Sequence, residues 1–168
     1  MKNLWAPWRV EYILGPKADG CVFCLDQKTR SDEQALARRQ ILHQGKNSFV
    51  LMNKYPYCNG HIIIAPYAHL SCITELHAES AAEFMALIQK STAILRQHFK
   101  AHGINIGVNL GEAAGAGVRE HLHCHLVPRW NGDSNFMAVM SEVRTIPQHL
   151  EETYQALLPY FTDIRIEK

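Results

Sequence analysis

Three histidines alternate with apolar residues in the segment 121–127, which reads HLHCHLV. Successive side chains of a strand point to opposite faces, so His121, His123 and His125 would share one face, with neighbours roughly 6.6 Å apart. Imidazole can act as a nucleophile, a base or a metal ligand near neutral pH. The spacing therefore predicts a strand with a row of reactive imidazoles on one side and an apolar row on the other.

Two other interpretations of this segment stay open at this point. In the first, the alternation is accidental and the rings are partly exposed. In the second, all three rings bind one metal ion, but residues i and i+4 of a strand lie roughly 13 Å apart, so the strand would have to bend. Strict alternation directly after a glycine-rich loop favours a catalytic role.

That loop, Gly111 to Val118, reads GEAAGAGV. Small residues let backbone N–H groups approach phosphate oxygens closely, which is typical of a phosphate-binding loop. The alternative is a flexible connection. Next to the histidine segment, the phosphate interpretation is favoured.

A pair of cysteines, Cys21 and Cys24, has the two-residue gap that lets both thiolates bind one tetrahedral ion. Such a pair needs two more ligands, and the alternative is a pair of reduced, partly buried thiols. The chain has five cysteines, an odd number at irregular spacing, which is a poor disulfide framework. We therefore expect a protein of the reducing cytoplasm.

The elements that must position these groups follow from hydrophobic periodicity and turn residues. We expect a hairpin around Gly45-Lys46, a buried strand at 61–65, strands at 104–110 and 120–129, and helices at 31–40, within 75–101 and at about 147–161. Ser31 would cap the first helix, with an exposed connection over 31–40 as the alternative. Ser80 and Glu83 fit a capping box in the second helix, with a start one turn earlier as the alternative, and Gly103 is its natural stop. The order of elements favours an α+β fold with an antiparallel five-stranded sheet, one long helix and one C-terminal helix.

Composition limits the classes of protein to consider. The chain has 168 residues, which suits one domain. Lys and Arg number 17 against 16 Asp and Glu, so a whole-surface grip on nucleic acid is not expected. The N-terminus lacks the apolar core of a signal peptide, and no apolar run is long enough to span a membrane.

The histidine segment resembles the signature of the histidine-triad (HIT) superfamily of nucleotidyl hydrolases and transferases, in which three histidines alternate with apolar residues. The upstream block NKYPYCNGHIIIAPYAH and the block GVNLGEAAGAGVREHLHCHLVPRWNGDSNFM are similar to the family's blocks. Within the superfamily, the chain looks closest to the bacterial branch that resembles diadenosine tetraphosphate phosphorylases, with its LWxPxR start, CxFC pair and GDxNFM tail. The similarity spans roughly residues 5–140. It implies a single HIT domain over 1–168, with a CxxC-bearing segment at 1–30 and a helical tail at 141–168.

The resemblance also implies roles for single residues. His123 would attack the α-phosphorus of a nucleotide, with its other ring nitrogen held by a backbone carbonyl near His121. His125 would contact phosphoryl oxygens or help to protonate the leaving group. The residues that would bind substrate are Asn53 at the ribose, His61 near the phosphates, Asn109, and the loop residues Gly115, Ala116, Gly117 and Val118.

The chain departs from many members of the superfamily in this loop. Those members place Gln and then Ser or Thr after the loop glycine, whereas this sequence reads Gly115-Ala116-Gly117-Val118. Backbone amides or Arg119 would take over the missing contacts. This departure weakens any transfer of leaving-group preference from members that carry the glutamine.

In zinc-bearing members of the superfamily, the ligands correspond to Cys21, Cys24, His69 and His121. The resemblance therefore implies a structural zinc ion that supports folding and does not polarise phosphate, and leaves open whether Mg²⁺ accompanies the substrate. It further implies a homodimer that binds nucleotides, whereas the balanced charge and the lack of a long apolar run predict no nucleic-acid or membrane partner.

The leading hypothesis is an enzyme that cleaves dinucleoside polyphosphates, such as diadenosine tetraphosphate, by hydrolysis or phosphorolysis through a nucleotidyl-His123 intermediate. The alternatives are a nucleoside phosphoramidase of the same superfamily and a zinc-stabilised nucleotide-binding module with negligible turnover.

Overall fold

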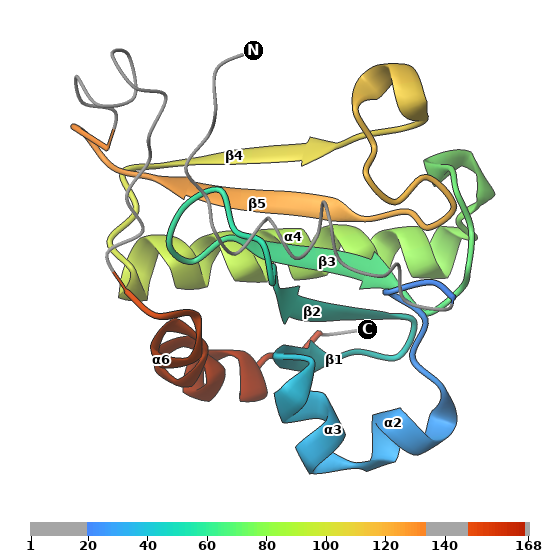
Figure 1. Ribbon diagram of the computed structural model, residues 1–168, viewed down its shortest axis with the longest axis horizontal. Coiled ribbons are helices and arrows are strands. Elements are labelled where there is room, and N and C mark those ends of the chain that lie inside the picture. Colours follow the sequence, from blue (N-terminus) through green and yellow to red (C-terminus); the bar gives the residue numbers. More distant parts are fainter. Residues whose placement is uncertain (1–19, 134–147, 167–168) are drawn as a thin grey trace.

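A five-stranded antiparallel sheet forms the centre of the computed structural model, which describes residues 20–133 and 148–166 (Figure 1). The spatial order of the strands is β1-β2-β3-β5-β4. Their bounds are Ile41–Gln44 for β1, Ser48–Met52 for β2, Ile62–Pro66 for β3, Gly103–Val108 for β4 and Cys124–Arg129 for β5. The α+β fold and the antiparallel five-stranded sheet are thus confirmed, including the hairpin around Gly45-Lys46.

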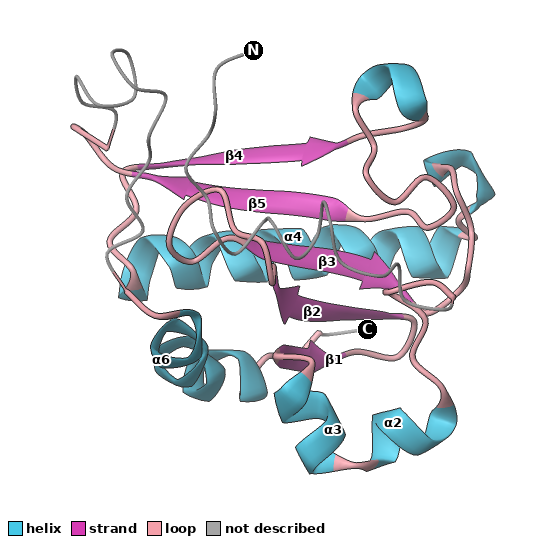
Figure 2. Ribbon diagram, viewed as in Figure 1, coloured by secondary structure: helices cyan, strands magenta, loops and turns pink. Residues whose placement is uncertain are grey.

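Helix α4, Ala78–His98, covers one face of the sheet (Figure 2). Alternation along the strands sends every second side chain toward this helix. The core between them is buried and apolar, and it includes Ile62, Ile64, Phe84, Leu87, Cys124 and Leu126. Cys124 and Leu126 of the histidine segment pack under the long helix, as the sequence predicts. The strand expected at 120–129 begins only at Cys124, so His121 and His123 precede it.

The long helix lies within the expected range 75–101, and it starts about one turn before Ser80, as the alternative to the capping box anticipated. The helix begins after His77, and Glu83 lies within it as a buried residue. The carboxylate of Glu83 accepts hydrogen bonds from the backbone amides of Asn47 and Ser48, so it fixes the β1–β2 turn and is not part of a capping box. The helix ends at Phe99, and Gly103 begins β4.

Two short helices replace the expected helix at 31–40. They are α2, Gln27–Ser31, and α3, Glu33–Arg38. Asp32 separates them and caps α3, because its carboxylate accepts from the amides of Gln34 and Ala35. Ser31 ends α2, and its hydroxyl donates to the carbonyl of Gln27, so the expected cap is wrong.

The C-terminal helix α6, Leu150–Thr162, packs against β1 at one edge of the sheet. The hydroxyl of Tyr154 donates to the carbonyl of Ile41, and Leu157 and Phe161 are fully buried. This helix covers an edge strand that would otherwise expose backbone groups. Its existence is confirmed, and it begins at Leu150; Pro147, expected in its first turn, lies outside the described residues.

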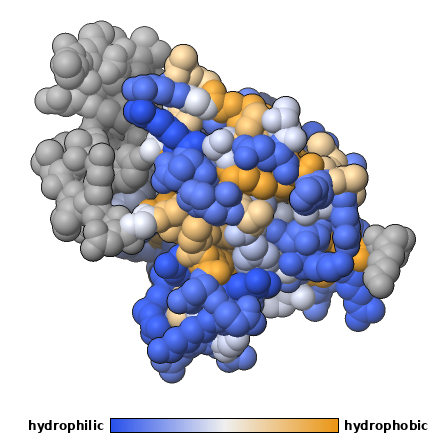
Figure 3. Space-filling model, turned by 90° about the vertical axis from the view of Figure 1, so that its right-hand side faces the viewer, coloured by the Kyte–Doolittle hydropathy of each residue, from blue (hydrophilic) through white to orange (hydrophobic). Residues whose placement is uncertain are grey.

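The part of the chain that the structure describes contains no helix with the length and hydrophobicity needed to cross a membrane. On the side that carries the loops after β3 and β4, hydrophobic and hydrophilic surfaces are interspersed (Figure 3). The LWxPxR start and the NFM residues of the GDxNFM tail lie outside the described residues.

Candidate active site

His123 lies at the centre of the face opposite α4, just before β5 begins at Cys124. Its Nδ1 is 2.8 Å from the backbone carbonyl oxygen of His121. Because a carbonyl can only accept, Nδ1 carries the proton and Nε2 keeps its lone pair. The side chain is only 5% exposed, and Nε2 has no hydrogen-bond partner among the described residues. This is the tautomer that a nucleophilic imidazole requires.

A chain of hydrogen bonds fixes the other two rings of the site. The backbone N–H of Tyr57 donates to Nδ1 of His61 at 3.1 Å, so Nε2 of His61 carries the proton. That nitrogen is 2.9 Å from Nδ1 of His125, which therefore accepts. It follows that His125 carries its proton on Nε2 and can donate to a ligand.

Burial keeps these histidines neutral. Burial, reinforced by the nearby charges of His125 and His123, lowers the pKa of His61 to about 3. Burial and the charge of His123 lower the pKa of His125 to about 4. The pKa of His123 is also lowered by burial. A neutral His123 has a lone pair available at neutral pH, whereas an imidazolium would not.

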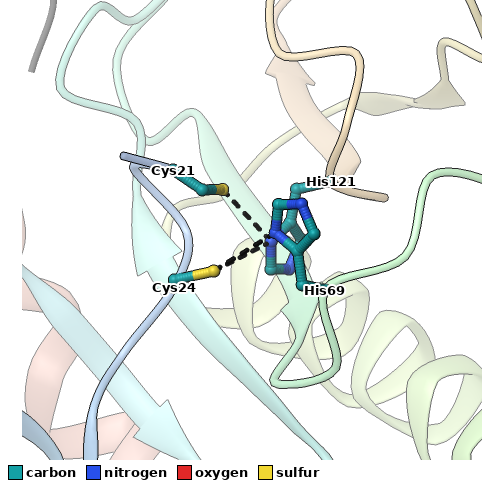
Figure 4. A group of neighbouring side chains, drawn as sticks. All are labelled: Cys21, Cys24, His69 and His121. Atoms are coloured by element: carbon teal, nitrogen blue, oxygen red, sulfur yellow. Dashed lines mark hydrogen bonds between the residues drawn. The ribbon is translucent and has the colours of Figure 1, made fainter. Parts of the chain in front are cut away.

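Four side chains from distant parts of the sequence form a second group beside this row: Cys21, Cys24, His69 and His121 (Figure 4). Their ligand atoms all lie within 4.8 Å of one another. Nδ1 of His121 is 3.3 Å from Sγ of Cys21 and 3.8 Å from Sγ of Cys24, and Nδ1 of His69 is 3.3 Å from Sγ of Cys24. Ligand atoms around tetrahedral zinc are roughly 3.3–3.8 Å apart, given its bond lengths to sulfur and nitrogen. The group therefore has the composition and spacing to hold a metal ion.

The tautomer of His121 also suits a metal ligand. Nε2 of His121 is 2.8 Å from the carbonyl oxygen of Pro66, so Nε2 carries the proton and Nδ1 faces the thiols. The backbone carbonyl of the same residue accepts from His123. His121 thus contacts the cysteine pair through its ring and His123 through its carbonyl.

Phe23, which the sequence interpretation missed, connects the two groups directly. It lies between the two cysteines, is 6% exposed, and its ring centroid is 4.8 Å from that of His123. Its position inside the CxxC motif is the one sequence feature that could have pointed to it. Tyr57, also missed, holds His61 through its backbone amide, which no sequence pattern reveals.

The two predicted asparagines occupy different positions. Asn53 contacts His61 through its side-chain nitrogen, 3.2 Å from Nδ1, and its backbone N–H donates to the carbonyl of His61. Asn109 is half-buried and directly follows the end of β4. Asn53 therefore lies at the histidine row, where it also supports His61.

The glycine-rich loop has more internal structure than a simple cradle. The amide of Gly115 donates to the carbonyl of Glu112, and the amide of Ala116 donates to that of Gly111. No hydrogen bond from the amides of Gly117 or Val118 is found within residues 20–133 and 148–166, which leaves these two as candidate phosphate donors. Arg119 makes an exposed two-bond ion pair with Glu112 across the loop.

Comparisons with known proteins agree with this geometry. A family model described as "HIT domain" matches residues 34–132. A protein named AP-4-A phosphorylase from Mycobacterium tuberculosis is 34% identical over 165 residues, which cover 94% of this chain and 83% of that protein. A bis(5'-adenosyl)-triphosphatase from Dictyostelium discoideum is 28% identical, and the match covers 56% of this chain and 62% of that protein.

A solved structure is similar over most of the chain. A Zn-bound histidine triad family protein from Mycobacterium smegmatis matches with a TM-score of 0.61 and 27% identity, over 79% of this chain and 94% of that chain.

Proposed function

The chain belongs to the HIT domain family, and from this premise we propose that it cleaves dinucleoside polyphosphates through a nucleotidyl-His123 intermediate. The observation that carries the proposal is the tautomer of His123: Nδ1–H is held by the carbonyl of His121, and the buried Nε2 is left with its lone pair. The names of the related AP-4-A phosphorylase and bis(5'-adenosyl)-triphosphatase support this class of substrate.

In the proposed first step, Nε2 of His123 attacks the α-phosphorus, and the bond to the bridging oxygen breaks. The leaving nucleotide takes the electron pair on that oxygen, and Nε2–H of His125 donates a hydrogen bond to a phosphoryl oxygen. The positive charge that develops on the His123 ring is stabilised at Nδ1–H by the carbonyl of His121. Water or inorganic phosphate then attacks the same phosphorus and releases His123.

The remaining predicted residues support this reaction. Asn53 and His61 would lie at the ribose and the phosphates, and Asn109 with the loop residues Gly115, Ala116, Gly117 and Val118 would line the phosphate site. The amides of Gly117 and Val118, which donate to no group in the described part of the chain, favour this role for the second half of the loop.

We also infer that Cys21, Cys24, His69 and His121 bind zinc, because two thiolates and two imidazoles at these separations suit a tetrahedral ion. With four protein ligands the ion would have no open position, so it would supply structural support and no direct contact with phosphate. The carbonyl of His121 would then hold His123 from a fixed point.

Product analysis with diadenosine tetraphosphate, with and without inorganic phosphate, tests the proposal. ATP plus ADP formed only with phosphate would identify phosphorolysis, and AMP plus ATP would identify asymmetric hydrolysis. We expect His123→Ala to lower either rate by about 1,000-fold or more while AMP binding is retained. His77→Ala, which removes an exposed histidine at the start of α4, is the matched control. A His123→Ala variant with a near-normal rate would contradict the mechanism.

A further inference from the structure

Gly107 of β4 lies directly opposite His125 of β5 in the antiparallel pairing. Directly opposed residues have Cβ positions about 5 Å apart, so the residue at 107 decides how much room is left beside the His125 ring on that side. On its other side, in β3, His125 is opposed by Ile63, which is 5% exposed. The β3 residue paired with His125 thus carries a side chain, whereas the β4 residue paired with it carries none.

Neither backbone geometry nor packing requires glycine at position 107. Gly107 is absent from the described glycines with positive φ, so its backbone is open to other residues. A Cβ placed on it would meet no atom within 4 Å, and the residue is exposed. Glycine inside a strand weakens the strand and often marks a position where a ligand approaches closely.

The neighbouring histidines point to a ligand independently of the glycine. His123 is 95% removed from solvent, yet Nε2 has no partner within the described part of the chain. The β1–β3 half of the same sheet face is already filled by a buried cluster that includes Phe23, Phe49 and Ile63. Within the described residues, no comparable cluster covers the two rings on the β4 side.

We propose that Gly107 determines how large a leaving group the enzyme accepts. When the bond between the α-phosphorus and the bridging oxygen breaks, the leaving nucleotide passes over Gly107 beside His125, where a larger side chain would block it. This inference rests on the proposed function, and it adds a residue whose small size admits the large leaving group of a dinucleoside polyphosphate.

Two substrates that share the adenylyl group test the inference: diadenosine tetraphosphate, which loses a nucleotide, and adenosine 5'-phosphoramidate, which loses ammonia. For Gly107→Val, we expect the ratio of kcat/KM for the large substrate to kcat/KM for the small one to fall by about tenfold or more. Gly103→Val is the matched control, because Gly103 lies on the same face of β4 but roughly 13 Å farther along. The ratio of the two kcat/KM values should be the same in Gly103→Val as in the parent.

Other outcomes are equally informative. An unchanged ratio in an active Gly107→Val overturns this inference alone, whereas a parent that cleaves neither substrate overturns the proposed function and the inference with it. An equal loss on both substrates with a changed molar mass would assign Gly107 to a subunit contact and overturn the inference.

Two alternatives keep the test decisive. If Gly107→Val fails to fold, Gly107→Ala replaces it, because its single Cβ enters open space, and a smaller shift in the same direction is expected. If only the large substrate turns over, the affinities of AMP and diadenosine tetraphosphate are compared in a His123→Ala background. There, Gly107→Val should weaken only the binding of the larger molecule.

Discussion

At the scale of single residues, backbone groups decide which nitrogen of each site histidine carries the proton. The carbonyls of Pro66 and His121 can only accept, and the amide of Tyr57 can only donate. Each contact leaves the second ring nitrogen in a defined state. The ring nitrogens of the site are therefore held in defined protonation states by the fold itself.

The buried His61 makes the free energy of unfolding depend on pH. In the folded chain its pKa is lowered to about 3, mainly by burial, from its ordinary value of 6.5. Between about pH 3 and pH 6.5 the unfolded chain binds more protons than the folded chain. The free energy of unfolding therefore increases with pH over this range, and the contribution of His61 is lost as the pH falls below about 6.5. We expect His61 to account for a loss of about 2 kcal/mol between pH 7 and pH 5.

Denaturant unfolding of the parent and of His61→Gln at both pH values measures this loss. The variant should lose about 2 kcal/mol less than the parent over the same interval, whatever its absolute stability. An equal pH dependence in the two proteins would contradict a neutral His61 in the folded state.

At the scale of elements, the CxxC loop joins the N-terminal part of the described chain to the start of the catalytic segment. Arg39, which caps α3, donates to the carbonyls of Val22 and Cys24, and Phe23 packs on His123. A metal ion held by this loop, His69 and His121 would connect three segments that are otherwise far apart in the sequence.

Removal of one ligand should therefore affect more than metal content. We expect about one zinc per chain in the purified parent, and Cys24→Ser should lose it, with a fall in Tm of about 10 °C. Metal analysis and thermal unfolding measure both quantities, and Cys72→Ser, outside the ligand group, is the control. If the parent has the same Tm without metal as with zinc, the zinc proposal is contradicted.

Helix α4 is tied to the β1–β2 turn by the buried carboxylate of Glu83. It accepts from the amides of Asn47 and Ser48 and from the side-chain nitrogen of Asn47. Glu83→Gln keeps the shape but turns a donor toward these donors, so we expect a loss of about 2–3 kcal/mol in the free energy of unfolding. The control is Glu79→Gln, because Glu79 also lies on α4 but forms only an exposed ion pair with Lys46. This variant should change the denaturation midpoint little. Similar midpoints for both variants would contradict the anchoring role.

At the scale of the whole molecule, β4 is an edge strand of the sheet, whereas α6 packs against β1 at the opposite edge. Ile106 of β4 is 49% exposed, and unpaired edges with exposed apolar residues favour pairing with another chain. We expect a homodimer joined along β4, as the family resemblance implies.

Light scattering after size exclusion measures this state. The parent should have a molar mass of twice 19.1 kDa. Ile106→Lys should shift the mass toward one chain, whereas Ile73→Lys, an exposed apolar residue of the loop after β3, should leave it unchanged. A monomeric parent at micromolar concentration would contradict the expected dimer.

The sequence alone determined the class of fold and most of the residues at the site. Alternation in the histidine segment assigned one row to the core and the other to the opposite face, because a strand has a fixed period of two. The role of Glu83 was less predictable, since its carboxylate accepts from the amides of the β1–β2 turn and not from the start of its own helix.

Only the tertiary structure decided how these residues work together. Tyr57 fixes His61 through an amide, His61 contacts His125, and Gly107 lies opposite His125, whereas the carbonyl that holds His123 was already implied by the family resemblance. Backbone groups are the same in every residue, and cross-strand neighbours depend on register. A sequence pattern therefore carries no record of them, and they are defined only when the strands and loops have packed.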